Sequence, residues 1–217
     1  MKRTITIVLV VLVALLAGCT QGSITGSGNV VTREEAFTGF DKLDVSHGFK
    51  VDVRQAEDFS VVIRVDDNVE KYLDVVKKGS TLQISLNWNL IAIRTTLEAE
   101  ITMPELAGLE LSGGTHCTVT GFESTKALDL DMSGGSDATL TGSAGDVTID
   151  ASGGSEADLS GFSVVDANVE ASGGSQVTVN ASGRLDADAS GGSKVYYLGS
   201  PTLGTIEESG GSSVRRK

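Results

Sequence analysis

Residues 130–136 read Leu-Asp-Met-Ser-Gly-Gly-Ser, and this short phrase returns, with small changes, along the second half of the chain. The intervals between the first serines of successive copies are 21, 19, 20, 18 and 19 residues. A near-constant period of this length is typical of repeat proteins in which each unit stacks on its neighbours. The sequence therefore predicts a solenoid. The six phrases begin at Ser112, Ser133, Ser152, Ser172, Ser190 and Ser209.

Apolar and polar residues alternate on both sides of each phrase. In Ile149-Asp150-Ala151 an acid stands between two apolar residues just before the serine, and Ala157 and Leu159 alternate with polar residues after it. A period of two indicates half-buried strands, and the glycines provide a corner with positive φ between them. We therefore expect an all-β, right-handed parallel β-helix with coils of about 19–20 residues, stacked about 4.8 Å apart.

The N-terminus has the features of a bacterial export signal. Lys2 and Arg3 precede an apolar run over residues 5–16, which is too short for a comfortable membrane span. Leu16-Ala17-Gly18-Cys19 resembles the lipobox, whose cysteine becomes the lipidated first residue of the mature protein. We predict a signal peptide over residues 1–18, a lipid-anchored tether over 19–27 and lipidation at Cys19. The alternative is an ordinary signal peptide with a chance cysteine.

A lipid anchor would make the membrane a partner and would place the protein outside the cytoplasm, on the cell surface or the periplasmic side. Removing residues 1–18 takes away two basic residues and no acidic ones, so the mature charge is 15 minus 29, or −14. This charge argues against nucleic acid as a partner, because phosphate binding needs a basic face. Cys117 alone remains for disulfide chemistry, and its repeat position predicts a small core residue.

Residues 28–217 are expected to form one β-solenoid domain, with a cap and first coils over 28–106 and regular Ser-Gly-Gly coils over 107–213. The stretch Leu43–Val53 repeats the regular pattern imperfectly and is predicted to be an early coil, although 66 residues separate Ser46 from Ser112. The interval should contain an irregular N-terminal cap that covers the first coil. Its predicted parts are a helical turn capped by Asp66-Asp67-Asn68, a hairpin at Lys78-Gly79-Ser80 and a strand over Leu97–Met103.

Several segments, taken in their order along the chain, resemble a known bacterial family. They are Gly26–Val30, Gly39 to Gly48, Gly79–Ile84, Ile101–Pro104 and the Ser-Gly-Gly repeats. Together they are similar to the domain called "putative auto-transporter adhesin, head GIN domain". The resemblance implies a β-helical, secreted or surface-anchored protein, and it brings no catalytic residues with it.

The outward acids before the serines form the most specific candidate site. Stacked in register they would make a column of like charges, which destabilises neighbouring strands by about 0.2–1 kcal/mol per pair. One interpretation is that water and salt screen the column and that it serves solubility. The sharper hypothesis is a ladder for a ligand or for calcium, which takes several oxygen ligands; no other cofactor is expected. The residues are Glu110, Asp131, Asp150, Glu170, Asp188 and Glu207.

Other candidates are weaker. A second outward column contains threonines such as Thr118 and Thr139, and regular threonine ranks can bind ice, but threonine is also simply a good strand residue. Trp88 and Arg94 could stack on a sugar or a partner, or Trp88 could cover the first coil. The two histidines stand at non-equivalent repeat positions, and no catalytic or metal-binding motif is recognisable.

These observations favour a lipid-anchored envelope β-helix that acts as a non-catalytic binding, adhesion or surface-display module. Its partner would be a glycan or an envelope protein. Two alternatives stay open at this point: a polysaccharide-acting β-helix enzyme and a purely structural envelope component.

Overall fold

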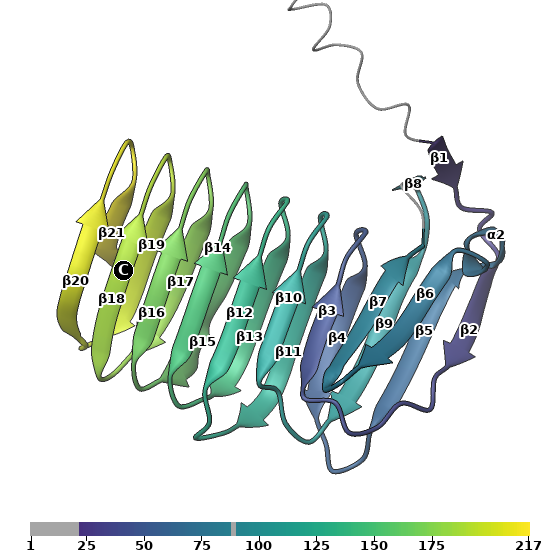
Figure 1. Cartoon of the computed structure of the whole chain (residues 1–217), viewed down its shortest axis with the longest axis horizontal. Helices are drawn as coiled ribbons and strands as arrows, with labels where there is room; N and C mark the ends of the chain where they lie inside the picture. Colours follow the sequence, from purple (N-terminus) through teal and green to yellow (C-terminus); the bar gives the residue numbers. More distant parts are fainter. Residues whose placement is uncertain (1–21, 88–89) are drawn as a thin grey trace, which may run out of the picture.

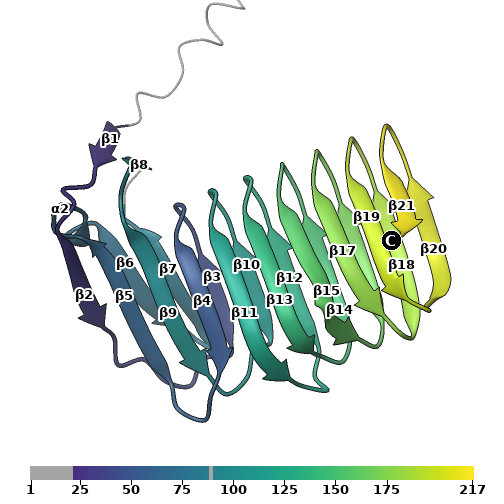
Figure 2. The same ribbon diagram turned by 180° about the vertical axis from the view of Figure 1, so that it is seen from behind.

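The computed structural model describes residues 22–87 and 90–217, which form a β-solenoid with about 20 residues per turn. Two sheets face each other, and successive coils contribute one strand to each sheet (Figure 1). The same stack is seen from behind in Figure 2, with the N-terminal cap at one end and the last coil at the other. The predicted repeat architecture is therefore confirmed.

Of the three sheets in the described residues, the two that face each other have nine and ten strands, and the third has two. The nine-stranded sheet runs in the order β20 (Thr202–Glu208), β18 (Arg184–Ala189), β16 (Ala167–Ala171), β14 (Val147–Ala151), β12 (Leu128–Met132), β10 (Gly108–Leu111), β3 (Lys42–Val45), β7 (Thr81–Leu86) and β6 (Leu73–Lys78). The ten-stranded sheet runs in the order β2 (Val30–Glu34), β5 (Ser60–Asp66), β9 (Leu97–Met103), β4 (Lys50–Gln55), β11 (His116–Glu123), β13 (Asp137–Ser143), β15 (Glu156–Val164), β17 (Gln176–Ala181), β19 (Lys194–Gly199) and β21 (Ser213–Arg216).

Side chains alternate between a shared core and the two outer faces. In β14, Val147, Ile149 and Ala151 are buried, while Thr148 and Asp150 are exposed. Cys117 lies in this core with 3% of its surface exposed. Its burial, with a smaller contribution from Asp52, raises the pKa of the thiol to about 12, so the cysteine is an inert core residue as predicted.

The glycine corners are tight because successive turns lie directly on one another. The first glycine of all six pairs has positive φ, but of the second glycines only Gly114 and Gly135 do. A Cβ on Gly173 would approach the carbonyl oxygen of Gly153 to 2.7 Å, whereas one on Gly174 would stay 3.5 Å from it. The first glycine is therefore needed both for its positive φ and for the close approach of the preceding turn. The second glycine tolerates a side chain better than the repeated pair in the sequence suggests.

The fourth residue of each turn has a role that the sequence analysis did not assign. Its hydroxyl points inward and lies 2.8–3.0 Å from the carbonyl oxygen of the first serine of the same turn. From the second turn onward it also lies 2.7–3.4 Å from a carbonyl oxygen of the preceding coil. These hydroxyls thus tie each coil to the one before it. The residues are Thr115, Ser136, Ser155, Ser175, Ser193 and Ser212, and all but Ser212 are buried.

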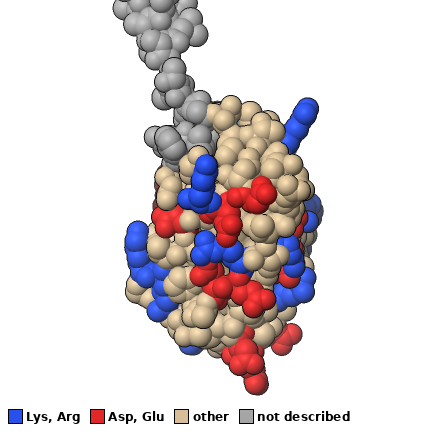
Figure 3. Space-filling view, turned by 90° about the vertical axis from the view of Figure 1, so that its right-hand side faces the viewer, with Lys and Arg blue, Asp and Glu red and all other residues tan. Residues whose placement is uncertain are grey.

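The early coil is β3 and β4, which pair in parallel with β10 and β11 despite the long interval between them. That interval folds back to form a further parallel layer, β7 and β9, and the antiparallel strands β5 and β6. With β2, these strands form the predicted N-terminal cap. Figure 3 shows this end of the molecule, where acidic and basic side chains are intermixed. In the cap strands β5 and β9, Arg64 and Glu100 form a 2.6 Å ion pair.

Asp66 holds the cap together. A short helix follows it, α2 (Asp67–Glu70), as predicted, but the Asp66 side chain does not cap that helix. The carboxylate is 1% exposed and accepts the backbone N–H groups of Gly28 at 2.7 Å and Thr96 at 2.6 Å. It therefore joins the start of the domain to the loop before β9.

A strand lies within the segment that the sequence predicts to be a tether. Residues 19–27 were predicted to be a tether, but β1 (Gly22–Thr25) pairs in parallel with β8 (Leu90–Ile93). The Asn68 amide donates to the carbonyl oxygen of Thr25 at 2.8 Å, which fixes the end of β1 to α2. Residues 1–21, including the predicted signal peptide, lie outside the described residues.

The last coil carries charged residues where the other coils carry core residues. Glu208 pairs with Ala189 in register, and its carboxylate accepts the Val214 N–H on the free edge of β21 at 2.6 Å. Arg216 pairs with Tyr197 and donates to the Gly199 carbonyl oxygen at 2.9 Å. Inward-pointing charges blunt an edge against further strand pairing. The basic C-terminal residues thus belong to the polar end of the stack.

We predict that Ser175→Ala destabilises the solenoid by about 1 kcal/mol, because it removes a buried hydroxyl shared by two carbonyl oxygens. Urea unfolding followed by circular dichroism measures the change. The matched control is Ser172→Ala in the same turn, since the half-buried Ser172 has no side-chain hydrogen bond in the structure. Equal midpoints for the two variants would contradict the role given to the inward hydroxyls.

Candidate functional site

The strand register places the outward acids in one column on the outer face of the nine-stranded sheet. Neighbouring strands in that sheet align each of the six predicted acids with the next. The column also extends one coil further, because Asp44 pairs with Glu110. We call these seven residues the acidic ladder: Asp44, Glu110, Asp131, Asp150, Glu170, Asp188 and Glu207.

An open groove follows the ladder. It has a volume of about 470 Å³ and lies between the acids and the turns that follow them. Beside the acids Asp131 to Glu207, its walls contain the first serines of four turns. Four coils therefore contribute both a ladder carboxylate and a hydroxyl to the groove, the Asp131 coil contributes its ladder carboxylate, and Glu208 also lines the groove at the last coil. The serines are Ser152, Ser172, Ser190 and Ser209.

A second hollow, of about 250 Å³, continues toward the N-terminal cap and shares Asp131 and Asp150 with the groove. It exists because Gly108 has no side chain in the outer face. The stem of Lys42 crosses this gap, 3.1 Å from where a Cβ of Gly108 would lie, and its ammonium group is 3.5 Å from the Asp129 carboxylate. Lys42 thus places one cation beside the ladder at this end.

The ladder itself is poorly compensated. Among the described residues, none of its seven acids forms an ion pair. Partial burial first, and then the neighbouring carboxylates of Asp44 and Asp131, raise the pKa of Glu110 above its ordinary value. At the end of the column the Gln83 amide donates to the Asp44 carboxylate at 2.5 Å.

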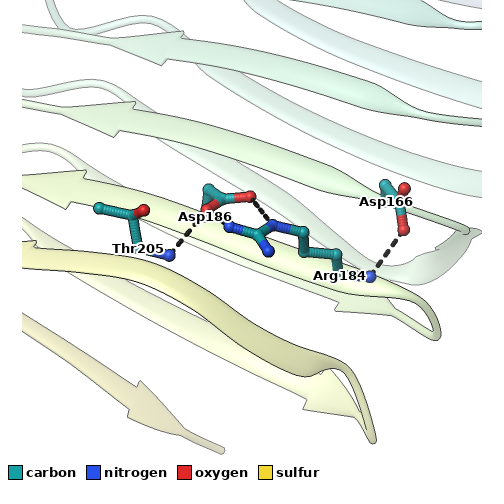
Figure 4. A network of polar contacts seen from close by, with 4 residues as sticks. All are labelled: Asp166, Arg184, Asp186 and Thr205. Carbon is teal, nitrogen blue, oxygen red and sulfur yellow. Dashed lines mark hydrogen bonds and ion pairs between the residues drawn. The ribbon is translucent and has the colours of Figure 1, made fainter.

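The neighbouring column of the same face is compensated instead. Figure 4 shows Arg184 holding the Asp186 carboxylate with two nitrogen–oxygen contacts of 2.6 and 2.7 Å, while the Thr205 N–H donates to it at 2.7 Å. The hydrogen bond from Arg184, followed by that from Thr205, lowers the pKa of Asp186 to about 2. Asp166 accepts the backbone N–H of Arg184 at 2.6 Å. Asp186 is therefore fixed in a structural contact, and the ladder acids remain free to meet a ligand.

The ladder has one carboxylate in each coil that it spans. In the part of the chain that the structure describes, no group of three or more His, Cys, Asp or Glu side chains is placed to hold a metal ion. A calcium ion on the ladder would therefore draw on neighbouring carboxylates of adjacent coils together with serine hydroxyls or water. Calcium binding stays a prediction.

The structure locates only some of the other residues that were predicted to contact a ligand or partner. Cys19 and Trp88 lie outside the described residues. Arg94 is exposed, has a φ of 48° and directly follows β8, at the edge where the chain enters the domain. The threonine column on the ten-stranded sheet is interrupted: Thr139 pairs with Asp158, and register shifts follow Thr120 and Thr139. That face is thus less regular than the acidic one.

Two parts of the site were missed from the sequence. Asp44 had a signal, because Leu43-Asp44-Val45-Ser46 repeats the pattern that precedes each Ser-Gly-Gly phrase. Lys42 had no such signal, since its contact with Asp129 depends on the stacking of β3, β10 and β12 and on the space above Gly108.

Among the described residues, no helix has the length and apolar character that a membrane span requires.

Comparison with known proteins gives one family and several structures of the same fold. The family described as "Putative auto-transporter adhesin, head GIN domain" matches residues 39–201. A crystal structure of "a putative adhesin" from Bacteroides fragilis NCTC 9343 has a TM-score of 0.73, with 20% identity over 89% of this chain and 100% of that chain. No curated protein matches this chain.

Two further crystal structures are similar. "A putative adhesin" from Parabacteroides merdae ATCC 43184 has a TM-score of 0.56, with 15% identity over 90% of this chain and 99% of that one. A "Putative lipid binding protein" from Parabacteroides distasonis ATCC 8503 has a TM-score of 0.54, with 19% identity over 90% and 99%. At these identities the likeness shows a shared fold.

We predict that Glu110→Gln stabilises the protein at neutral pH by up to about 1 kcal/mol, because it removes like-charge contacts with both neighbours in the ladder. The folded-state pKa of Glu110 is raised, so the wild-type protein carries this penalty fully above that pKa and loses it as the pH falls. Thermal unfolding at neutral pH and below the ordinary carboxyl pKa of about 4 measures the difference. Glu123→Gln, at an exposed acid of the other sheet, is the control; an equal gain there would contradict the ladder explanation.

Proposed function

The chain belongs to the family described as "Putative auto-transporter adhesin, head GIN domain", and from this premise we propose that it is a non-catalytic adhesion-type module anchored to the cell envelope by a lipid on Cys19. The contact surface in this proposal is the acidic ladder with its groove. The single observation that supports it is the register that aligns the acids of successive coils beside an open groove.

The repeated geometry suits multivalent binding. Each of the four coils that line the groove with a serine adds one ladder carboxylate and one turn serine, at the spacing of hydrogen-bonded strands, about 4.8 Å. A polymer with its own repeat can therefore meet several weak contacts at once, and linked contacts raise overall affinity without any strong single site. Because the ladder has no ion pairs within the described chain, a ligand that carries positive charge would relieve its repulsion.

The partner that fits this chemistry is an envelope polymer with cationic groups. We propose the amino groups of a glycan, or lysine-rich segments of an envelope protein, as the groups that meet the ladder. Calcium offers a second route, because it could bridge a ladder carboxylate and an anionic ligand. The two routes are distinguished by the effect of a chelator.

The anchor gives the module its location. Cys19 follows a basic start and a short apolar run, and three residues after it the first strand begins. A lipid on Cys19 would hold the domain to a membrane surface without a spanning segment, outside the cytoplasm.

We predict that Cys19→Ser releases the mature protein from the membrane fraction. The substitution removes the thiol that would carry the lipid, whereas the apolar run that is predicted to direct export is unchanged. Fractionation of cells followed by immunoblotting measures the distribution, and mass spectrometry of the wild-type protein shows the lipid. Wild-type protein without lipid, or a Cys19→Ser variant that stays with the membrane, would contradict the anchor.

We predict that neutralising the ladder lowers binding to cationic envelope polymers about tenfold or more, equivalent to about 1.4 kcal/mol. The lipid-free mature protein is tested on a glycan array and in pull-downs, with calcium and with chelator. The variant is Asp131→Asn, Asp150→Asn and Glu170→Gln together.

The control removes three charges from the other sheet, by Glu123→Gln, Asp137→Asn and Glu156→Gln together. Equal losses for the two triple variants would show a general charge effect and contradict the ladder as the contact surface. Turnover of any glycan on the panel would favour an enzyme instead. An envelope defect on deletion, without binding to any polymer, would favour a purely structural component.

A further inference from the structure

We propose that the protein lies with one defined edge against the membrane, namely the edge formed by the Ser-Gly-Gly turns, so that the phospholipid surface is the partner of these turns. We call it the glycine edge; it consists of residues 112–115, 133–136, 152–155, 172–175, 190–193 and 209–212. The inference rests on the proposed lipid at Cys19 and deepens it by assigning an orientation to the anchored domain.

The first step is the length of chain between the lipid and the fold. Strand β1 begins at Gly22 and is held by β8, so three residue steps separate Cys19 from the ordered domain. An extended chain covers at most about 3.6 Å per residue, which limits this distance to about 11 Å. The part of the domain nearest β1 must therefore lie close to the lipid headgroups.

The second step is the position of β1 on the solenoid. Its partner β8 lies in the connection that runs from β7 in the nine-stranded sheet to β9 in the ten-stranded sheet. In every regular coil that same connection is the Ser-Gly-Gly turn. β7 and β9 stack on β3 and β4, so β8 extends the same edge of the molecule. Figures 1 and 2 show β1 and β8 beside the row of turns at the N-terminal end of the stack.

This position argues against an upright solenoid with its axis along the membrane normal. An upright orientation would need the anchor to leave from the end face of the cap, which is formed by β2, β5 and β6. Instead the chain enters at the side of the stack, on the edge that the turns share. A short anchor at the side brings that side toward the membrane.

The third step is the chemistry of the glycine edge. Its crest carries glycine, serine and threonine and no charged residue. Both glycines are exposed in the four turns from residue 133 to residue 193. The opposite edge, where the chain returns to the nine-stranded sheet, carries Lys126, Asp146, Asp166 and Arg184, all of them exposed. Of these two edges, the glycine edge can therefore approach headgroups with the smaller loss of water from charged groups.

The orientation also leaves the proposed binding surface open. The acidic ladder lies on a sheet face, two residues behind the crest of the turns. With the glycine edge against the membrane, both sheet faces stand at its side and the groove opens to the solution. A solenoid lying on its acidic face would instead bury the ladder against the bilayer.

Site-specific labelling of the full lipidated protein on phosphatidylcholine vesicles tests the proposal. Gly154→Cys places a fluorophore on the glycine edge, at a glycine without positive φ and with no atom within 4 Å of the new Cβ. Ser200→Cys places it on the opposite edge, at an exposed residue. Gly192→Cys is a second label on the glycine edge; its Cβ would lie 3.4 Å from the nearest atom, the carbonyl oxygen of Gly173.

The readout is quenching by a nitroxide attached to the lipid headgroup. We expect quenching at Gly154→Cys and Gly192→Cys to be several-fold stronger than at Ser200→Cys. Cys117 is buried and the Cys19 thiol carries the lipid, so wild-type protein should take up no label, which serves as the background control. The thermal unfolding midpoint of each variant confirms that it is folded.

The other outcomes separate the orientation from the anchor. Vesicle-bound protein with equal quenching at all three positions, or with stronger quenching at Ser200→Cys, would overturn the orientation while the anchor stands. Protein that carries no lipid on Cys19, or that does not sediment with the vesicles, would overturn the proposed anchor and this inference with it.

Discussion

The structure depends on one constraint: each coil must lie on the previous coil in parallel register, with the same repeat position above itself. Parallel backbone hydrogen bonds require neighbouring strands to be about 4.8 Å apart, and the corners must keep that spacing. The first glycine of each pair and the inward hydroxyl that follows meet this need. Gly173 lies so close to Gly153 that a side chain has no room, and the Ser175 hydroxyl links its turn to the coil before.

The same constraint explains both the strength and the cost of the fold. Stacking aligns apolar residues such as Ile149 and Val169 in a continuous core, which is favourable at every coil. It equally aligns Asp150 with Glu170, which is unfavourable while no ligand or counter-ion is present. Stacking in register multiplies the favourable and the unfavourable contacts alike. The uncompensated ladder therefore calls for a functional reason, and the proposed adhesion to a cationic polymer would supply one.

The two ends of the stack are capped in different ways, so the two ends of the molecule differ. Antiparallel strands and the buried carboxylate of Asp66 close the N-terminal end, where β1 brings the chain in at the side. Charged residues at inward positions, Glu208 and Arg216, finish the last coil. The strand β1, the glycine edge and the acidic groove consequently have fixed positions relative to one another. The proposed lipid on Cys19 would therefore orient the proposed binding face.

The repeating features follow from the sequence alone: the period, the two strands per coil, the inward and outward faces, and the alignment of the acids. Periodic features can be predicted from the sequence because every repeat has the same local pattern of residues, and stacking places equivalent residues next to each other. The features that do not repeat depend instead on long-range packing. Four features depend on contacts between segments far apart in the sequence. Residues 56–107 fold back and place β9 beside β4, and the Asp66 carboxylate accepts backbone N–H groups from two distant segments. Strand β1 pairs with β8, and the Lys42 side chain lies over Gly108. No local period encodes such contacts, because each arises once, from the packing of unlike segments against each other.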